Sequence, residues 1–227
     1  MGEPRVPAGL LDAVERDLTP VRPLAAPSRR ALLLLPLGLA LLVGLPAFWG
    51  WRNNLAALGP AAAWGLSAVQ ALAGLWIAGA ALREAVPGRE LSATAVAGAV
   101  GAALALFVGL TLATELLVPT PVPPGAWLRY AWECFGMATV WSVPALVVVA
   151  WLASRALPTR PAVAGALYGL GTGLMADAGV RLFCRVSSPA HVLVAHGGAI
   201  LFLVVAGACA ATAVERRKAR AASKGAS

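Results

Sequence analysis

Cys134 and Cys184, followed by His191 and His196, carry the most distinctive chemistry of the chain. A pair of thiols can form a reversible disulfide, form a permanent structural disulfide, or capture a soft metal ion together with imidazole or carboxylate ligands. Cysteines that only pack are the remaining alternative. We favour a switching or sensing role for Cys134 and Cys184, and any metal is expected to bind them only transiently.

The positions of these two thiols predict similar depths in a helical bundle. Cys134 lies 24 residues before Pro158, and Cys184 lies 26 residues after it, with a short turn between the two helical segments. At a rise of 1.5 Å per residue the thiols differ in depth by only about 3 Å. A disulfide needs Cα atoms within about 7 Å, which matched depths permit but do not establish.

The histidines are poorly spaced for a shared metal site on a regular α-helix. His191 and His196 are five residues apart, which corresponds to about 140° around such a helix. We therefore expect no complete site of two cysteines and two histidines. His196 is the better candidate for a sensing role, because two glycines directly after it leave space beside its ring.

Ionisable side chains inside apolar stretches are a second group of candidates, because such residues are costly near hydrocarbon and usually face a bundle interior or water. Opposite charges at helical spacing precede each cysteine, Arg129 with Glu133 and Asp177 with Arg181. Glu115 has no cation nearby in the sequence, and we expect it to pair across helices with Arg129 or Arg181. These five residues form the predicted supporting polar cluster.

Six apolar stretches must position these residues. Composition indicates a membrane protein, because 59% hydrophobic and only 12% charged residues do not suit the polar surface of a soluble domain. Each stretch reaches the roughly 20 residues that a helix needs to cross a hydrocarbon core. The sequence predicts an all-α membrane protein with a six-helix transmembrane bundle, spanning residues 31–51, 60–82, 92–118, 131–154, 161–182 and 190–214.

Basic residues alternate between the connections. Of 18 Lys and Arg residues, 14 lie in the two terminal segments and in the connections after the second and fourth stretches. The positive-inside rule then places both termini in the cytoplasm. The cations lie at membrane exits, so we expect the lipid bilayer as a partner and no direct nucleic-acid binding. No cofactor is expected.

Small residues recur every four positions in two stretches, at 165, 169 and 173 and from 93 to 109. This spacing allows close approach of helices, and we expect ordinary packing from both sets. Cys209, in the inner half of the last stretch, is likewise expected to be a packing residue.

Residues 1–30 are the predicted cytosolic docking segment, ahead of a membrane bundle at 31–214 and a basic cytosolic tail at 215–227. Residues 8–18 predict a short amphipathic helix with one apolar stripe and a mostly acidic polar face, followed by a proline-rich stalk. An acidic face suits a basic protein groove better than a negative lipid surface, which is the alternative along with a disordered tail. The predicted docking residues are Leu10, Leu11, Asp12, Val14, Asp17 and Leu18.

Three blocks of sequence carry a resemblance to a known family. They are residues 10–30 with the run Pro20-Val21-Arg22-Pro23-Leu24, Trp132-Glu133-Cys134 with the glycine-rich fifth stretch, and Cys184 with Ser188-Pro189-Ala190 and Ala195-His196-Gly197. In these blocks the chain resembles the NrsF family of multi-pass bacterial anti-sigma factors, negative regulators of sigma F and related extracytoplasmic-function sigma factors. The resemblance implies sequestration of a sigma factor at the inner membrane, with both cysteines required for release.

Two other functions share some of these features. A disulfide-generating membrane enzyme would use the outer cysteines, but the chain lacks the Cys-x-x-Cys pair of such a relay. A small transporter would use the intramembrane carboxylates, but no chain of acids continues to the cytoplasmic side. We therefore expect a protein that is not an enzyme and that holds an extracytoplasmic-function sigma factor through its N-terminal segment. Metal or oxidant at Cys134 and Cys184 would release it.

Overall fold

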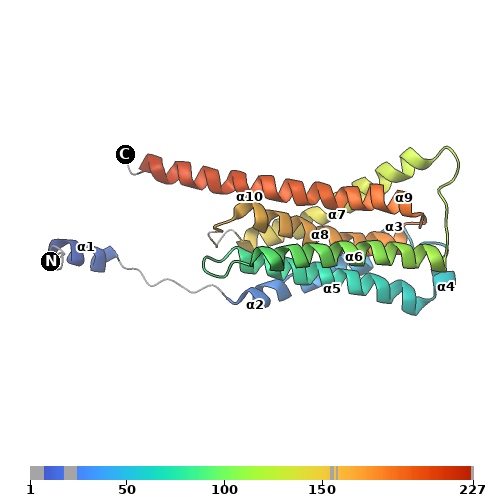
Figure 1. Cartoon of the computed structure of the whole chain (residues 1–227), viewed down its shortest axis with the longest axis horizontal. Coiled ribbons are helices and arrows are strands. Elements are labelled where there is room, and N and C mark those ends of the chain that lie inside the picture. The colour runs from blue at the N-terminus through green and yellow to red at the C-terminus, as the bar shows by residue number, and fades with distance from the viewer. Residues whose placement is uncertain (1–7, 18–24, 154–155, 157, 226–227) are drawn as a thin grey trace.

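The computed structural model describes residues 8–17, 25–153, 156 and 158–225, and the regular structure within these residues is entirely helical (Figure 1). The predicted all-α class is confirmed. The elements are α1 (Ala8–Asp17), α2 (Pro27–Leu32), α3 (Leu35–Trp49), α4 (Leu55–Leu58), α5 (Pro60–Glu84), α6 (Ala93–Leu117), α7 (Trp127–Ala153), α8 (Pro161–Phe183), α9 (Pro189–His191), the π-helical turn η1 (Val192–His196) and α10 (Gly197–Gly225).

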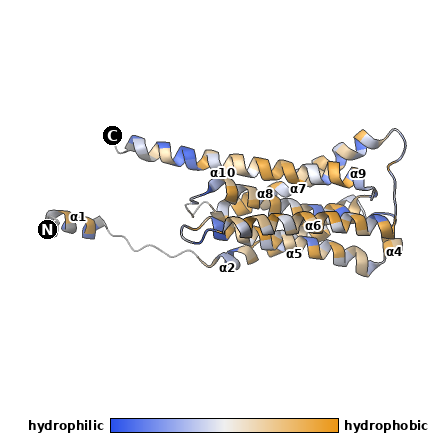
Figure 2. Ribbon diagram, viewed as in Figure 1, coloured by the Kyte–Doolittle hydropathy of each residue, from blue (hydrophilic) through white to orange (hydrophobic). Residues whose placement is uncertain are grey.

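Five helical units in the described chain are long and apolar enough to cross a membrane. Each overlaps a predicted span, and apolar residues run along most of their length (Figure 2). The fifth predicted span is α8, which has 23 residues but is not among these five because its composition is less apolar. The five units are Pro27–Trp49, Pro60–Glu84, Ala93–Leu117, Trp127–Ala153 and Pro189–Ala221.

The less apolar composition of α8 follows from its central position. It packs against α3, α5, α7 and α10, and residues 171–180 are all buried. A helix that is enclosed in this way faces its neighbours rather than lipid, so it tolerates charged residues that are costly in contact with lipid.

Glycines allow the close packing around α8. A Cβ at Gly165 or Gly169 would overlap the backbone of α10, and one at Gly171 or Gly179 would overlap the backbone of α5 or α3. The predicted packing role of the small residues in this stretch is confirmed. Gly207 completes the α8–α10 contact, since a Cβ there would overlap the carbonyl of Gly165.

The small residues of α6 do not pack as predicted. Positions 93, 97, 101, 105 and 109 are all exposed, and a Cβ at Gly101 or Gly109 would meet nothing within 4 Å. The opposite face of α6 is the buried one, with Ala103 and Phe107 in the core. The packing predicted for Cys209 is wrong for a similar reason, because its side chain is exposed on the outer face of α10.

Hydrogen bonds between connections define two ends of the bundle. At one end Arg160 forms a bidentate ion pair with Glu84, at 2.7 and 2.8 Å, and donates to the carbonyl of Leu91 at 2.6 Å. At the other end the Asn54 amide donates to Thr120 Oγ1 at 2.7 Å. The chain enters the bundle at the Arg160 end, and α10 ends beyond that same end (Figure 1).

Replacing Gly169 with Val should destabilise the bundle by at least about 1–3 kcal/mol, because the added side chain overlaps the α10 backbone. The matched control is Gly101→Val, which adds the same side chain to an open face of α6. Thermal unfolding of the protein in detergent, followed by circular dichroism, measures both. Equal midpoints for the two variants would contradict the close packing of α8 on α10.

Candidate functional site

Cys134 of α7 and Cys184, directly after α8, meet at the end of the bundle opposite Arg160. Their Sγ atoms are 3.3 Å apart, and each residue is 4% exposed. Both are free thiols. The similar depth predicted for the two sulfur atoms is confirmed.

His191 and His196 lie beside the two thiols, so the prediction that they could not share a site is wrong. The reason is the π-helical turn η1, whose hydrogen bonds join residues five apart and so place His191 above His196. The ring centroids are 5.5 Å apart. One ligand atom from each of the two cysteines and two histidines lies within 4.8 Å of the others. No signal in the sequence indicated this turn.

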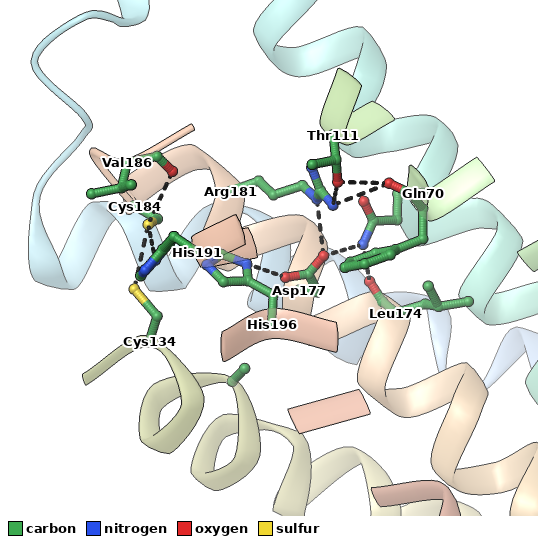
Figure 3. A network of polar contacts seen from close by, with 12 residues as sticks. Gln70, Thr111, Cys134, Leu174, Asp177, Arg181, Cys184, Val186, His191 and His196 are labelled. Atoms are coloured by element: carbon green, nitrogen blue, oxygen red, sulfur yellow. Dashed lines mark hydrogen bonds and ion pairs between the residues drawn. The ribbon is translucent and has the colours of Figure 1, made fainter. Parts of the chain in front are cut away.

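Cys184 makes contacts on several sides. Its Sγ atom is 3.6 Å from His191 Nε2 and 3.6 Å from the carbonyl oxygen of Val186 (Figure 3). Both histidines are at most 1% exposed. The arrangement has the donor atoms for two chemistries, disulfide formation between the sulfurs and coordination of a soft cation by sulfur and nitrogen.

Asp177 connects this thiol–imidazole cluster to the bundle interior. Its Oδ1 accepts a hydrogen bond from His196 Nδ1 at 2.6 Å, and its Oδ2 accepts from Gln70 Nε2 at 2.6 Å and Arg181 Nε at 2.9 Å (Figure 3). The carboxylate is fully buried. The predicted pair of Asp177 with Arg181 is confirmed. Gln70 was not predicted, although an amide in the apolar stretch of α5 is a signal for such a contact.

Arg181 extends the same network to α6. Its Nη2 donates to Thr111 Oγ1 at 2.9 Å, and its guanidinium lies 4.9 Å from the centre of the Phe107 ring. The hydrogen bonds around Asp177 and Arg181 therefore join α5, α6, α8 and η1.

Glu115 does not pair with Arg129 or Arg181 as predicted. It accepts a hydrogen bond from the Ser187 hydroxyl at 2.8 Å. Arg181 is already occupied by a fully buried carboxylate on its own helix. A hydroxyl in the loop after α8 therefore satisfies Glu115 in place of a cation.

Arg129 and Glu133 form no ion pair within the described chain, so that predicted pair is also wrong. Both are exposed, and Arg129 lies 5.3 Å from the ring centre of Tyr130. An exposed ion pair yields little net energy in water, which explains why helical spacing alone does not create one. Both residues line a cleft of about 560 Å³ that also reaches Cys134 and Cys184.

Arg52, in the connection after α3, is a buried neighbour of the site that sequence reasoning missed. It donates to Asn54 Oδ1 at 2.6 Å, and its backbone N–H donates to the carbonyl of Leu182 at 3.1 Å. Burial is the main cause that lowers the pKa of Arg52 from its ordinary value. This backbone hydrogen bond joins the connection after α3 to the end of α8, two residues before Cys184.

Five of the six predicted docking residues lie on a separate helix, α1. Leu10 and Val14 are 55% and 50% exposed, and Asp12 is exposed as well. Leu11 and Asp17 belong to the same helix, whereas Leu18 lies outside the described residues. Figure 1 places α1 beyond the end of the bundle at which α10 also ends.

Comparison with protein families gives a match that covers residues 15–216 and is described as NrsF, negative regulator of sigma F. The chain belongs to the NrsF family. The matched range includes Cys134, Cys184, His191, His196 and Asp177. Comparison with curated proteins and with solved structures gives no match. NrsF proteins are regulatory anti-sigma factors rather than enzymes, so this NrsF chain is a negative regulator with a sigma factor as its partner.

Replacing Asp177 with Ala should lower the free energy of unfolding by about 3–5 kcal/mol, because Arg181 is left largely buried without its counter-charge. The control is Glu133→Ala, which removes an exposed carboxylate from the same end of the bundle. Denaturant unfolding in mixed micelles measures both variants. A loss for Asp177→Ala no larger than the control's would contradict the anchoring role of this carboxylate.

Proposed function

We propose that this protein is a membrane anti-sigma factor that sequesters an extracytoplasmic-function sigma factor through its N-terminal segment and releases it when metal or oxidant acts on Cys134 and Cys184. The observation that carries the proposal is the family match over residues 15–216. The structure supports it by placing two different features at opposite ends of the bundle, a helix with an exposed apolar stripe and a buried pair of thiols.

In this proposal six helical units cross the inner membrane with both termini in the cytoplasm. Five units are apolar enough to face lipid, and the enclosed α8 is the sixth. An even number of crossings returns the chain to its starting side. Arg83 in the last turn of α5, Arg89 in the connection that follows it and Arg160 just before α8 lie at the same end as the basic termini. Their charge supports a cytoplasmic location for that end. The thiols then face the periplasm.

The docking surface of the proposal is the apolar stripe of α1. Leu10 and Val14 are half exposed, and Asp12 and Asp17 add negative charge to the helix. A complementary partner surface is an apolar groove with basic edges, which we assign to the sigma factor. An isolated helix of 10 residues is only marginally stable in water, so binding in such a groove would stabilise it.

Release begins in this proposal at the outer end of α7 and α8. Two thiols 3.3 Å apart can be oxidised to a disulfide. A peroxide accepts two electrons and two protons as the S–S bond forms, and it is reduced to water or to water and an alcohol. The contact of Cys184 with His191 and the surroundings of the adjacent His196 change as a result. Asp177, which binds His196, transmits the change to α5 and α6. About 1.4 kcal/mol of coupling suffices for a tenfold change in sigma affinity.

Replacing Val14 with Asp should weaken sigma binding at least about tenfold, because a charge would replace an apolar side chain that the partner buries. Ala13→Asp is the control, since it adds the same charge to the neighbouring exposed residue outside the apolar stripe. The affinity of purified sigma factor for the detergent-solubilised protein measures both. Equal affinities for the two variants, or full sequestration after deletion of residues 1–24, would exclude docking through α1.

Replacing Cys134 and Cys184 together with Ser should leave the sigma factor held during stress, because no thiol remains to react. A sigma-dependent reporter measures the response to peroxide and to cadmium in cells. Cys209→Ser is the matched control and should respond like the unmodified protein, since this third thiol is exposed on α10 and lies apart from the pair. A normal response in the double variant would rule out the thiol switch.

A further inference from the structure

We infer that Cys134, Cys184, His191 and His196 together form a complete four-ligand site for a soft divalent cation of the zinc class. This inference names a ligand for the sensing end of the bundle, so its signalling role rests on the proposed function. Cation binding itself does not, because it depends only on these four side chains and their surroundings.

The distances suit a tetrahedral cage. One ligand atom from each residue lies within 4.8 Å of the others, the sulfurs are 3.3 Å apart, and Cys184 Sγ is 3.6 Å from His191 Nε2. In a tetrahedral zinc site with Zn–S near 2.3 Å and Zn–N near 2.0 Å, neighbouring ligand atoms are separated by about 3.3–3.8 Å. Small side-chain movements therefore convert the cluster into a coordination sphere.

An unpartnered ring nitrogen is a second observation that points to a ligand. Among the described residues, His196 Nε2 is buried without a hydrogen-bond partner. Leaving such an atom unsatisfied costs about 1–3 kcal/mol. His196 uses Nδ1 for Asp177, so Nε2 is the nitrogen that remains for coordination.

Asp177 has the position of the outer carboxylate that supports a metal-bound histidine. By accepting the Nδ1 proton of His196 it fixes the tautomer in which Nε2 carries the lone pair, and it increases the basicity of the ring. Gln70 and Arg181 hold the other carboxylate oxygen, so the orientation of Asp177 is itself fixed. The hydrogen bonds of Asp177 with Gln70, Arg181 and His196 thus hold the His196 ring in the orientation that coordination requires.

Charge balance and softness define the class of cation. Two thiolates neutralise a divalent ion, and two neutral imidazoles complete four-fold coordination, so the loaded site carries no net charge in its buried surroundings. Binding releases the two thiol protons and therefore weakens as the pH falls. Thiolate and imidazole ligands favour zinc or cadmium over the hard cations magnesium and calcium. The cleft of about 560 Å³ beside both cysteines is the route of entry.

Cobalt(II) is the spectroscopic probe for the test, with the full-length protein reduced and solubilised in detergent. We expect one equivalent to give the intense visible bands of tetrahedral coordination together with thiolate charge transfer, and zinc or cadmium to abolish both. His191→Gln and His196→Gln should each weaken binding at least about tenfold, and Asp177→Asn about 10–100-fold. Cys209→Ser is the matched control and should bind like the unmodified protein. Magnesium should not compete.

Alkylation of the unmodified protein provides a measurement that does not depend on the folding of any variant. Zinc should slow the reaction of Cys134 and Cys184 with iodoacetamide at least tenfold, while Cys209 reacts at an unchanged rate. A purely octahedral cobalt spectrum, unslowed alkylation, or full affinity in both histidine variants would overturn the inference.

The affinity of the zinc-loaded protein for the sigma factor distinguishes failure of the cation site from failure of the proposed function. Binding of zinc without any effect on sigma would contradict only its signalling role, whereas sequestration without zinc binding would contradict only the site.

Discussion

The buried carboxylate of Asp177 is the interaction on which the interior of this bundle depends. An ionised group away from water must be compensated by charge and hydrogen bonds, or it destabilises the fold by several kcal/mol. Asp177 obtains its compensation from Arg181 on its own helix, Gln70 on α5 and His196 on η1. Because these partners come from different parts of the chain, their alignment fixes how the helices meet.

The fold was largely predictable from the sequence, because the length and hydropathy of a membrane helix are set by the bilayer rather than by its neighbours. The positions of the long helices, the similar depth of the two thiols and the Asp177–Arg181 pair followed from the sequence pattern. The exception to simple hydropathy, α8, is enclosed by other helices, and a hydropathy pattern cannot distinguish a helix that faces lipid from one that does not.

The thiol–imidazole cluster was less predictable, because it depends on local irregularity and on tertiary neighbours. A regular helix would separate His191 from His196, and only the π-helical turn brings both to the sulfurs. Glu115 illustrates the dependence on tertiary neighbours. Its partner, Ser187, lies in a loop distant in sequence, and no periodicity identifies such a contact. Helical spacing alone also gave a wrong ion pair between Arg129 and Glu133. Both side chains are exposed, and exposure to water removes most of the energy of such a pair.

The same packing determines how a change at the thiols can reach the other end of the bundle. The loop after α8 carries Cys184, and α8 itself contacts α10 through Gly165, Gly169 and Gly207 with backbone against backbone. Surfaces packed so closely do not deform gradually, so displacement at one end of α8 shifts the helix against α10 as a unit. Gly165 lies near the start of α8, at the end of the bundle where Arg160 binds Glu84. The central helix is therefore the most direct physical connection between the thiols and the end of the bundle at which we propose that the sigma factor binds.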